Sequence, residues 1–146
     1  MPRKPASPHA EKTGCPIAFG VDLFGDRWTL LVLRDLLVFR KRHYGEFLAS
    51  DEGIATNVLA DRLQRLEAVG VVERRKDPRQ RNRVIYRPTQ KGKDLVPVLL
   101  EIVRWSGKHD PGTAAPAEFL ERLERDRDGM VQELLAAMDA EAADDC

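Results

Sequence analysis

Residues 53–87 read GIATNVLADRLQRLEAVGVVERRKDPRQRNRVIYR, and this stretch decides the fold of the chain. In its first half, Leu59, Leu63 and Leu66 recur at the spacing of one helical face. The polar residues between them fall on the opposite face, because successive residues are rotated by about 100° around a helix. The pattern predicts an amphipathic helix over 55–69, closed by a glycine that suits the end of a helix.

The second half predicts a β-hairpin, with strands over 71–76 and 83–87 and a polar turn between them. From residue 74 to residue 93 there are nine basic residues and one acidic residue, Asp77. A helix followed by a basic hairpin is the layout of a winged helix-turn-helix, in which the helix can enter a DNA major groove and the hairpin can lie along phosphates. We therefore predict a mainly α fold with a small β-hairpin wing.

Apolar spacing on both sides of this stretch predicts additional helices, with Asp26 and Thr89 as N-cap residues. Pro97 is expected to kink the helix that contains it. The apolar face of the last helix would be exposed on its own, so it should pack on the first or fifth helix or on a second subunit. The N- and C-terminal helices are the expected dimerisation elements. The predicted helices outside the central stretch cover residues 17–24, 27–39, 44–49, 89–107 and 117–140.

Charge is distributed unevenly along the chain. Residues 1–110 carry 21 basic and 14 acidic residues, whereas residues 111–146 carry 3 basic and 10 acidic residues. The formal net charge of zero thus combines a basic body with an acidic tail, an asymmetry that points to a polyanionic partner. We expect a disordered polar arm over 1–14, a DNA-binding domain over 15–110, and a linker with an acidic helix over 111–146.

The composition also indicates where the protein works. No stretch approaches the roughly 18–20 apolar residues that a membrane span requires. The first residues lack the apolar core of a secretory signal. We therefore expect a cytoplasmic protein with no membrane partner.

The helix over 55–69 supplies the candidate base contacts. Asn57 and Gln64 lie opposite the leucines, and their amides suit bidentate recognition of adenine. Thr56 lies at the N-terminal end, which usually reaches the bases. Arg65 and Arg62 flank this face and suit phosphates or guanine, although for Arg62 an ion pair within its own helix is an open alternative.

Basic residues outside that helix are candidate phosphate contacts. Arginines in the wing turn have Asp77 as their only opposing charge in the sequence nearby. Two arginines in the turn before the helix over 44–49 could touch the DNA backbone or simply be solvated. The complete set of candidate DNA contacts is Thr56, Asn57, Arg62, Gln64, Arg65, Arg79, Arg81, Arg83, Arg40 and Arg42.

Cys15 is a candidate redox-sensing residue. It precedes Pro16 at the start of a predicted helix, where the helix dipole favours the reactive thiolate. The alternative is a small buried side chain at a dimer seam. Cys146 is expected to be inert, or to resolve an oxidised Cys15 across a dimer. Two cysteines do not form a disulfide framework.

The sequence predicts neither an enzyme nor a metal or cofactor site. The three histidines, His9, His43 and His109, are scattered, and neither cysteine has the spacing of a metal ligand. No histidine or acid is placed in the sequence to activate Cys15, and no glycine-rich phosphate loop occurs.

Several motifs, in this order, resemble the HxlR family of bacterial transcription regulators: CPI at residue 15, GDRWTLLVLRDLL at 25–37, YGEF at 44, the helix-to-wing stretch from 53, and YRPTQKGKDLVPVL at 86–99. The resemblance implies a dimeric winged-helix DNA-binding protein related in fold to MarR-type regulators, usually a repressor. It also implies that a cysteine ahead of the first helix can sense electrophiles or oxidants. The sequence specifies no inducer.

Three departures from the family pattern affect these expectations. Ala55 and Thr56 stand where family members usually have Ser and Pro. We therefore expect either that Thr56 caps the helix or that the helix starts late, and we expect the base contacts to differ. The wing turn is long and rich in arginine, and the tail beyond Gly112 has no counterpart in shorter members. The alternative function is a winged-helix interaction module whose basic wing binds an acidic protein or the acidic tail.

Overall fold

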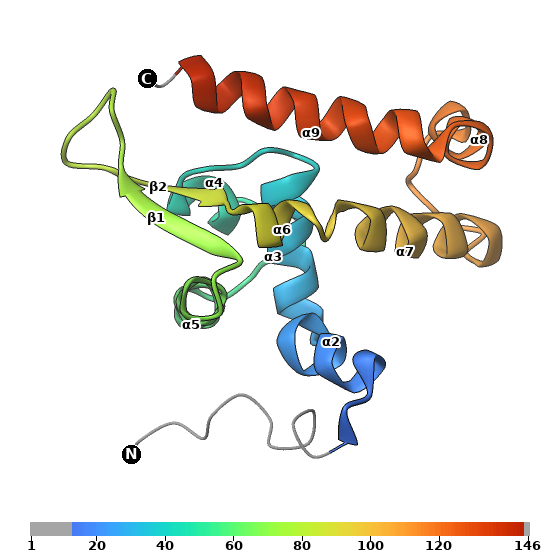
Figure 1. The fold of residues 1–146 in the computed structure, drawn as a ribbon, viewed down its shortest axis with the longest axis horizontal. Helices are drawn as coiled ribbons and strands as arrows, with labels where there is room; N and C mark the ends of the chain where they lie inside the picture. The colour runs from blue at the N-terminus through green and yellow to red at the C-terminus, as the bar shows by residue number, and fades with distance from the viewer. Residues whose placement is uncertain (1–12, 145–146) are drawn as a thin grey trace.

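The computed structural model describes residues 13–144, so most of the predicted arm and Cys146 lie outside the described residues. Helices dominate, and the two strands form one antiparallel hairpin (Figure 1), which confirms the predicted fold class. The elements in chain order are α2 (Pro16–Phe24), α3 (Arg27–Leu37), α4 (Tyr44–Leu48), α5 (Thr56–Ala68), β1 (Val72–Lys76), β2 (Val84–Pro88), α6 (Gln90–Lys93), α7 (Val96–His109), α8 (Ala117–Arg125) and α9 (Arg127–Asp144).

Local sequence explains where several helices begin and end. The Asp26 carboxylate accepts a hydrogen bond of 3.2 Å from the Thr29 amide, so Asp26 caps α3 as predicted. Thr89 likewise caps α6. The prediction that Thr56 caps α5 was wrong: Ala55 is the cap residue, with no side-chain hydrogen bond, and Thr56 is the first helical residue. Gly70 follows α5 with a φ of +78°, which glycine adopts without strain.

The core lies around α3, which runs through the middle of the molecule (Figure 1). Its residues Leu33, Leu36 and Leu37 are fully buried. Helix α5 packs on α3 through the predicted stripe of Leu59, Leu63 and Leu66, all of them buried, so the predicted amphipathic face is confirmed. This packing leaves the opposite face of α5 open to solvent.

The hairpin pairs Val72 with Pro88 and Lys76 with Val84, and β2 packs on α3 and α4. Ile85 is buried against the body, whereas the basic side of β1 is exposed. Tyr86 rests its half-buried ring against Phe47 of α4, with ring centroids 6.3 Å apart and planes at 83°. The wing is thereby fixed to the helix-turn-helix pair.

Two predicted long helices were wrong, because each is two helices. The helix predicted over 89–107 is α6 and α7, and Pro97 lies in the first turn of α7, where a missing N–H group costs no helical hydrogen bond. The helix predicted over 117–140 is α8 and α9, separated at Asp126. Helix α3 ends at Leu37, so Phe39 lies beyond it and is exposed.

The C-terminal helices fold back onto the body. Both α8 and α9 pack on α7, which is the fifth of the helices predicted from the sequence. Their buried residues Leu123, Met130, Val131 and Met138 belong to the same core as α3 and α5. The tail is therefore an integral part of the folded unit.

Apolar side chains remain exposed on two helices, α2 and α7. No residue of α2 is buried, and Ile17 is 75% exposed. Trp105 of α7 is 66% exposed, and Ile102 is exposed as well. Within residues 13–144, no helix combines the length and apolar character of a membrane span.

Candidate nucleic-acid interface

Helix α5 is held in place by α4 and by the turn that precedes it. The Tyr44 hydroxyl donates a hydrogen bond of 2.7 Å to the Thr56 carbonyl at the start of α5. On α3, the Arg34 guanidinium makes two hydrogen bonds, of 2.8 and 2.7 Å, to the carboxylate of Glu52. Because these bonds favour the charged carboxylate, they lower the pKa of Glu52 to about 2. The helix-turn-helix pair α4–α5 is therefore anchored on α3.

The outward face of α5 carries the predicted base-contacting residues. Thr56, Asn57 and Gln64 are exposed, as the helical spacing predicted. The face borders an open hollow of about 590 Å³ lined by Asn57, Val58, Ala60, Asp61, Arg62, Gln64 and Arg65. Amide and guanidinium groups thus lie together on a shallow and solvent-accessible surface of α5.

Asp61, which was not among the predicted DNA contacts, also lies on this face. Its carboxylate is 2.7 Å from Nη1 of Arg62 and 2.9 Å from Nε of Arg65. Arg62 also reaches Asp26 at 3.0 Å, and its side chain is only 20% exposed. The pair with Asp61 is the ion pair within its own helix that was the alternative for Arg62, and the pair with Asp26 also ties α5 to the start of α3. Arg65 remains mostly exposed.

The wing turn connects β1 to β2 and displays three of the predicted arginines. Asp77 organises it: its amide donates to the Arg83 carbonyl at 2.8 Å, and its carboxylate accepts from the Arg79 amide at 2.8 Å. Arg79, Arg81 and Arg83 are exposed. The turn therefore presents basic side chains on an ordered backbone.

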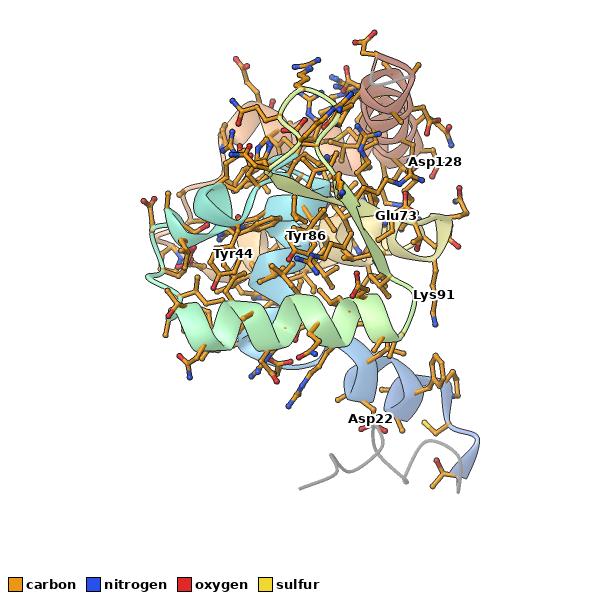
Figure 2. The ribbon with its side chains drawn as sticks, turned by 90° about the vertical axis from the view of Figure 1, so that its left-hand side faces the viewer. Asp22, Tyr44, Glu73, Tyr86, Lys91 and Asp128 are labelled. Carbon is orange, nitrogen blue, oxygen red and sulfur yellow. The ribbon has the colours of Figure 1, made fainter. Side chains whose placement is uncertain are left out.

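A second hollow, of about 330 Å³, lies between α4 and the wing. Figure 2, which looks onto this side of the molecule, shows Tyr44 and Tyr86 above the length of α5. Arg74, Asn82 and Tyr44 were missed as site residues. The pairing of Arg74 with Tyr86 in the hairpin register could have indicated Arg74, but the position of α4 beside the wing is set by tertiary packing. The lining residues are His43, Tyr44, Gly45, Arg74, Asn82, Arg83, Val84 and Tyr86.

Arg40 and Arg42, in the turn before α4, have different surroundings. Arg40 is exposed, with a φ of +55°. Arg42 is buried, donates to the Leu36 carbonyl at 2.8 Å and contacts Glu141 of α9 at 2.8 Å. Burial lowers the pKa of Arg42, while the Glu141 carboxylate opposes that shift. The predicted phosphate contact of Arg42 does not fit this placement, because its guanidinium is turned into the protein.

Cys15 is the N-cap residue of α2, and no side chain caps this helix end. Its amide donates to the Thr13 hydroxyl at 3.2 Å, and its carbonyl accepts from the Phe19 amide at 3.0 Å. The thiol is free and partly exposed. Reagents can therefore reach a thiol placed at the positive end of a helix dipole.

Comparisons with known proteins agree on one family. A family model described as "HxlR-like helix-turn-helix" matches residues 23–113. The relative sll1512 of Synechocystis sp., named as an HTH-type transcriptional regulator, is 38% identical over 86 residues, which cover 59% of this chain and 63% of that protein. The chain thus spans less than two thirds of the length of this relative.

Solved structures show the same fold. The crystal structure of PA1607, which is described as a transcription factor, matches with a TM-score of 0.66 and 32% identity. The match covers 74% of this chain and 75% of that chain. The redox regulator HypR in its oxidised form matches with a TM-score of 0.58 and 28% identity, covering 65% of this chain and 97% of that chain. The family match includes all of α3 to α7, hence both the helix-turn-helix pair and the wing. The chain belongs to the HxlR-like helix-turn-helix family.

Proposed function

We propose that this protein is a sequence-specific DNA-binding transcriptional regulator that acts as a homodimer and, as the family resemblance implies, as a repressor. The main support is the placement of two kinds of side chain on one side of the molecule. Helix α5 presents Thr56, Asn57 and Gln64, and the wing turn presents Arg79, Arg81 and Arg83. Helix α5 and the hairpin both face the viewer in Figure 2, with the wing turn at the end of the hairpin away from α5. A helix of this kind fits a major groove, while basic side chains in an adjacent hairpin meet the phosphates.

Each group of residues has a separate role in this proposal. Asn57 and Gln64 read base edges through their amides, and Thr56 approaches the bases from the N-terminal end of α5. Arg65 contacts phosphate or guanine after exchanging its ion pair with Asp61. Arg62 positions α5 through Asp26 rather than reading DNA.

Dimerisation would use the exposed apolar residues at the two ends of the winged-helix unit. Ile17, Phe19 and Val21 of α2 and Ile102 and Trp105 of α7 are all exposed in the single chain. A two-fold interface with a second copy would bury such residues on both subunits. Two copies would present two α5 helices to half-sites about one DNA turn apart, roughly 34 Å.

The direct test is binding of the reduced protein to a duplex from upstream of its own gene and to a scrambled duplex, across a salt series. We expect tight, selective binding that weakens steeply with salt, because each neutralised phosphate releases counterions. Weak and equal binding to both duplexes would favour the alternative interaction module, in which the wing binds an acidic protein.

Arg81→Ala is expected to weaken binding to both duplexes alike and to reduce the salt slope by about one unit, since one phosphate contact is lost. The control is Arg125→Ala, which removes the same charge from an exposed position on α8, far from the wing in Figure 1. Equal slopes for Arg81→Ala and wild type would remove Arg81 from the interface.

We propose further that Cys15 makes DNA binding responsive to oxidants. The support is a partly exposed thiol at the start of α2, together with the likeness in fold to a protein named as a redox regulator. Oxidation at this position would add bulk and a covalent constraint next to the apolar face of α2 that the proposed dimer buries.

Diamide, which takes two electrons and two protons from a pair of thiols, is expected to release DNA from the wild type but not from Cys15→Ser. Cys146→Ser serves as the second variant: if it still releases DNA, the disulfide joins Cys15 to the partner's Cys15. Fluorescence anisotropy measures this release. If wild type and Cys15→Ser release DNA equally, Cys15 is not the sensor.

A further inference from the structure

The imidazole of His43 lies between two carboxylates that come from different parts of the fold. Its Nδ1 is 2.8 Å from Oε1 of Glu46 on α4, and its Nε2 is 2.9 Å from Oδ2 of Asp77 in the wing turn. The side chain of Asp77 is only 8% exposed and that of His43 is 23% exposed. The His43 ring is therefore a direct link between the helix-turn-helix pair and the wing.

Two carboxylates at hydrogen-bonding distance require two N–H donors on the ring. Only the protonated imidazolium carries both, because the neutral ring has one donor and one acceptor nitrogen. The neutral form would turn a lone pair toward one of the carboxylates. The observed geometry thus matches a positively charged His43.

The contact with His43 also lowers the pKa values of both carboxylates. The hydrogen bond from His43 lowers the pKa of Asp77 below its ordinary value. Burial raises the pKa of Glu46, but hydrogen bonds from the His43 backbone and ring outweigh it and leave this pKa lowered. Both acids are therefore held in their charged form by the contact with His43, and the ring is the one member of this trio that carries a positive charge when protonated.

Asp77 also transmits the state of His43 to the wing. The same carboxylate that meets the ring accepts the Arg79 amide, and the Asp77 amide closes the turn on the Arg83 carbonyl. A shift of Asp77 away from α4 would therefore move the turn that carries Arg79, Arg81 and Arg83.

His43 forms one wall of the 330 Å³ hollow between α4 and the wing. Arg74 and Arg83 line the same hollow, and Tyr44 joins it to the first turn of α5 through its bond to Thr56. Two charged groups contact the His43 ring, Glu46 of α4 and Asp77 of the wing turn. The other charged or titratable residues that line the hollow with it are Tyr44 of α4, Arg74 of β1 and Arg83, which precedes β2.

We propose that this hollow binds one backbone phosphate of DNA and that protonation of His43 switches the site on. The proposal rests on the DNA binding proposed above and specifies its regulation. With His43 charged, the imidazolium offsets two carboxylates beside the hollow, and Arg74 and Arg83 can hold a phosphate. With His43 neutral, those carboxylates repel the phosphate and the wing turn loses its tie to α4. The DNA contact is therefore present at low pH and is lost as pH rises.

The first arm measures DNA affinity and its salt slope, with the two duplexes used above. Between a lower and a higher pH of a titration series we expect the wild type to lose roughly tenfold in DNA affinity as pH rises, the loss of one charge-assisted contact. Over the same interval the salt slope should fall by about one unit, because one phosphate is released. His43→Gln should show the shallow slope and the weaker affinity at both pH values.

Two variants serve as controls. His109→Gln removes an exposed histidine that lies against Trp105 on α7, and it should keep the wild-type pH profile. Asp77→Asn retains an oxygen acceptor for the Arg79 amide but removes the charge facing Nε2, and it should flatten the profile. Circular dichroism melts show whether each variant is folded at both pH values.

The second arm uses the free protein, so that it does not depend on DNA. The NMR shift of the Arg79 amide should follow the titration of the His43 ring in the wild type and should not move in His43→Gln. Failure to bind either duplex at any pH would overturn the proposed function and this site with it. Two results would overturn the phosphate switch alone. One is intact DNA binding whose affinity depends on pH in the same way in wild type and His43→Gln. The other is an Arg79 amide whose chemical shift does not follow the titration of His43.

Discussion

Phe47→Ala is expected to lower the free energy of unfolding by about 4 kcal/mol, within the range for truncating a buried phenylalanine. Phe47 is 1% exposed and belongs to the core that joins α3, α4 and α5. Its ring also meets Tyr86 of β2 edge-on. The cavity left by the truncation would remove apolar contacts from α4 and loosen the wing at the same time.

Urea denaturation followed by circular dichroism measures this loss, and Phe39→Ala is the matched control. Phe39 is 59% exposed and lies near two cations, with the Arg34 Cζ 5.3 Å and the Lys41 Nζ 5.9 Å from the ring centre. Truncating Phe39 should lower the free energy of unfolding by about 1 kcal/mol or less. If Phe47→Ala does not fold, Phe47→Leu should give a smaller loss of the same sign. Equal losses for the two alanine variants would contradict the packing of α4 described above.

Gly92→Ala is expected to destabilise the protein by about 2 kcal/mol through overpacking. Gly92 is buried in α6, where an added Cβ would overlap the Val71 carbonyl oxygen and lie 3.3 Å from the Pro88 Cβ. The Val71 carbonyl is held in position, because it accepts hydrogen bonds from the amide and hydroxyl of Thr89, at 3.1 and 3.2 Å. It therefore cannot move away easily from an added Cβ. Alanine would otherwise be the better helix former, so the clash must outweigh that gain.

Gly45→Ala is the corresponding control for thermal or urea melts. Gly45 is also helical, in α4, but a Cβ added there would meet no atom within 4 Å. This substitution should leave stability unchanged or raise it by about 0.5–1 kcal/mol. A Gly92→Ala variant as stable as Gly45→Ala would show that α6 does not approach the start of the hairpin this closely.

Local pattern was sufficient for some elements and insufficient for others. The leucine spacing of α5, its terminal glycine and the hairpin could be read from the sequence, because each depends on neighbours within one helical turn or one strand pair. Pro97 was misread, since a proline suits the first turn of a helix as well as it disrupts the middle, and only the true start of α7 distinguishes the two.

The same distinction between local and long-range determinants applies to the residues of the candidate site. Exposure of Asn57 and Gln64 follows from helical periodicity. The positions of Arg42 and His43 do not, because their partners Glu141 and Asp77 lie 99 and 34 residues away in the sequence. Arg42 was assigned to DNA from its charge alone, and its burial depends on how α9 returns to the body.

The return of α8 and α9 also fixes charge in space. In both views the acidic helix α9 lies on the opposite side of the body from α5, and the wing turn reaches out at the α9 end of the hairpin (Figures 1 and 2). A chain with no formal net charge thus holds its acidic helix and its basic wing turn at fixed places, so the electric field around it is uneven. In the field of a polyanion such a molecule experiences a torque, which turns its basic wing forward. Productive encounters would then be selected by orientation before any side chain touches a base, an effect that added salt would screen.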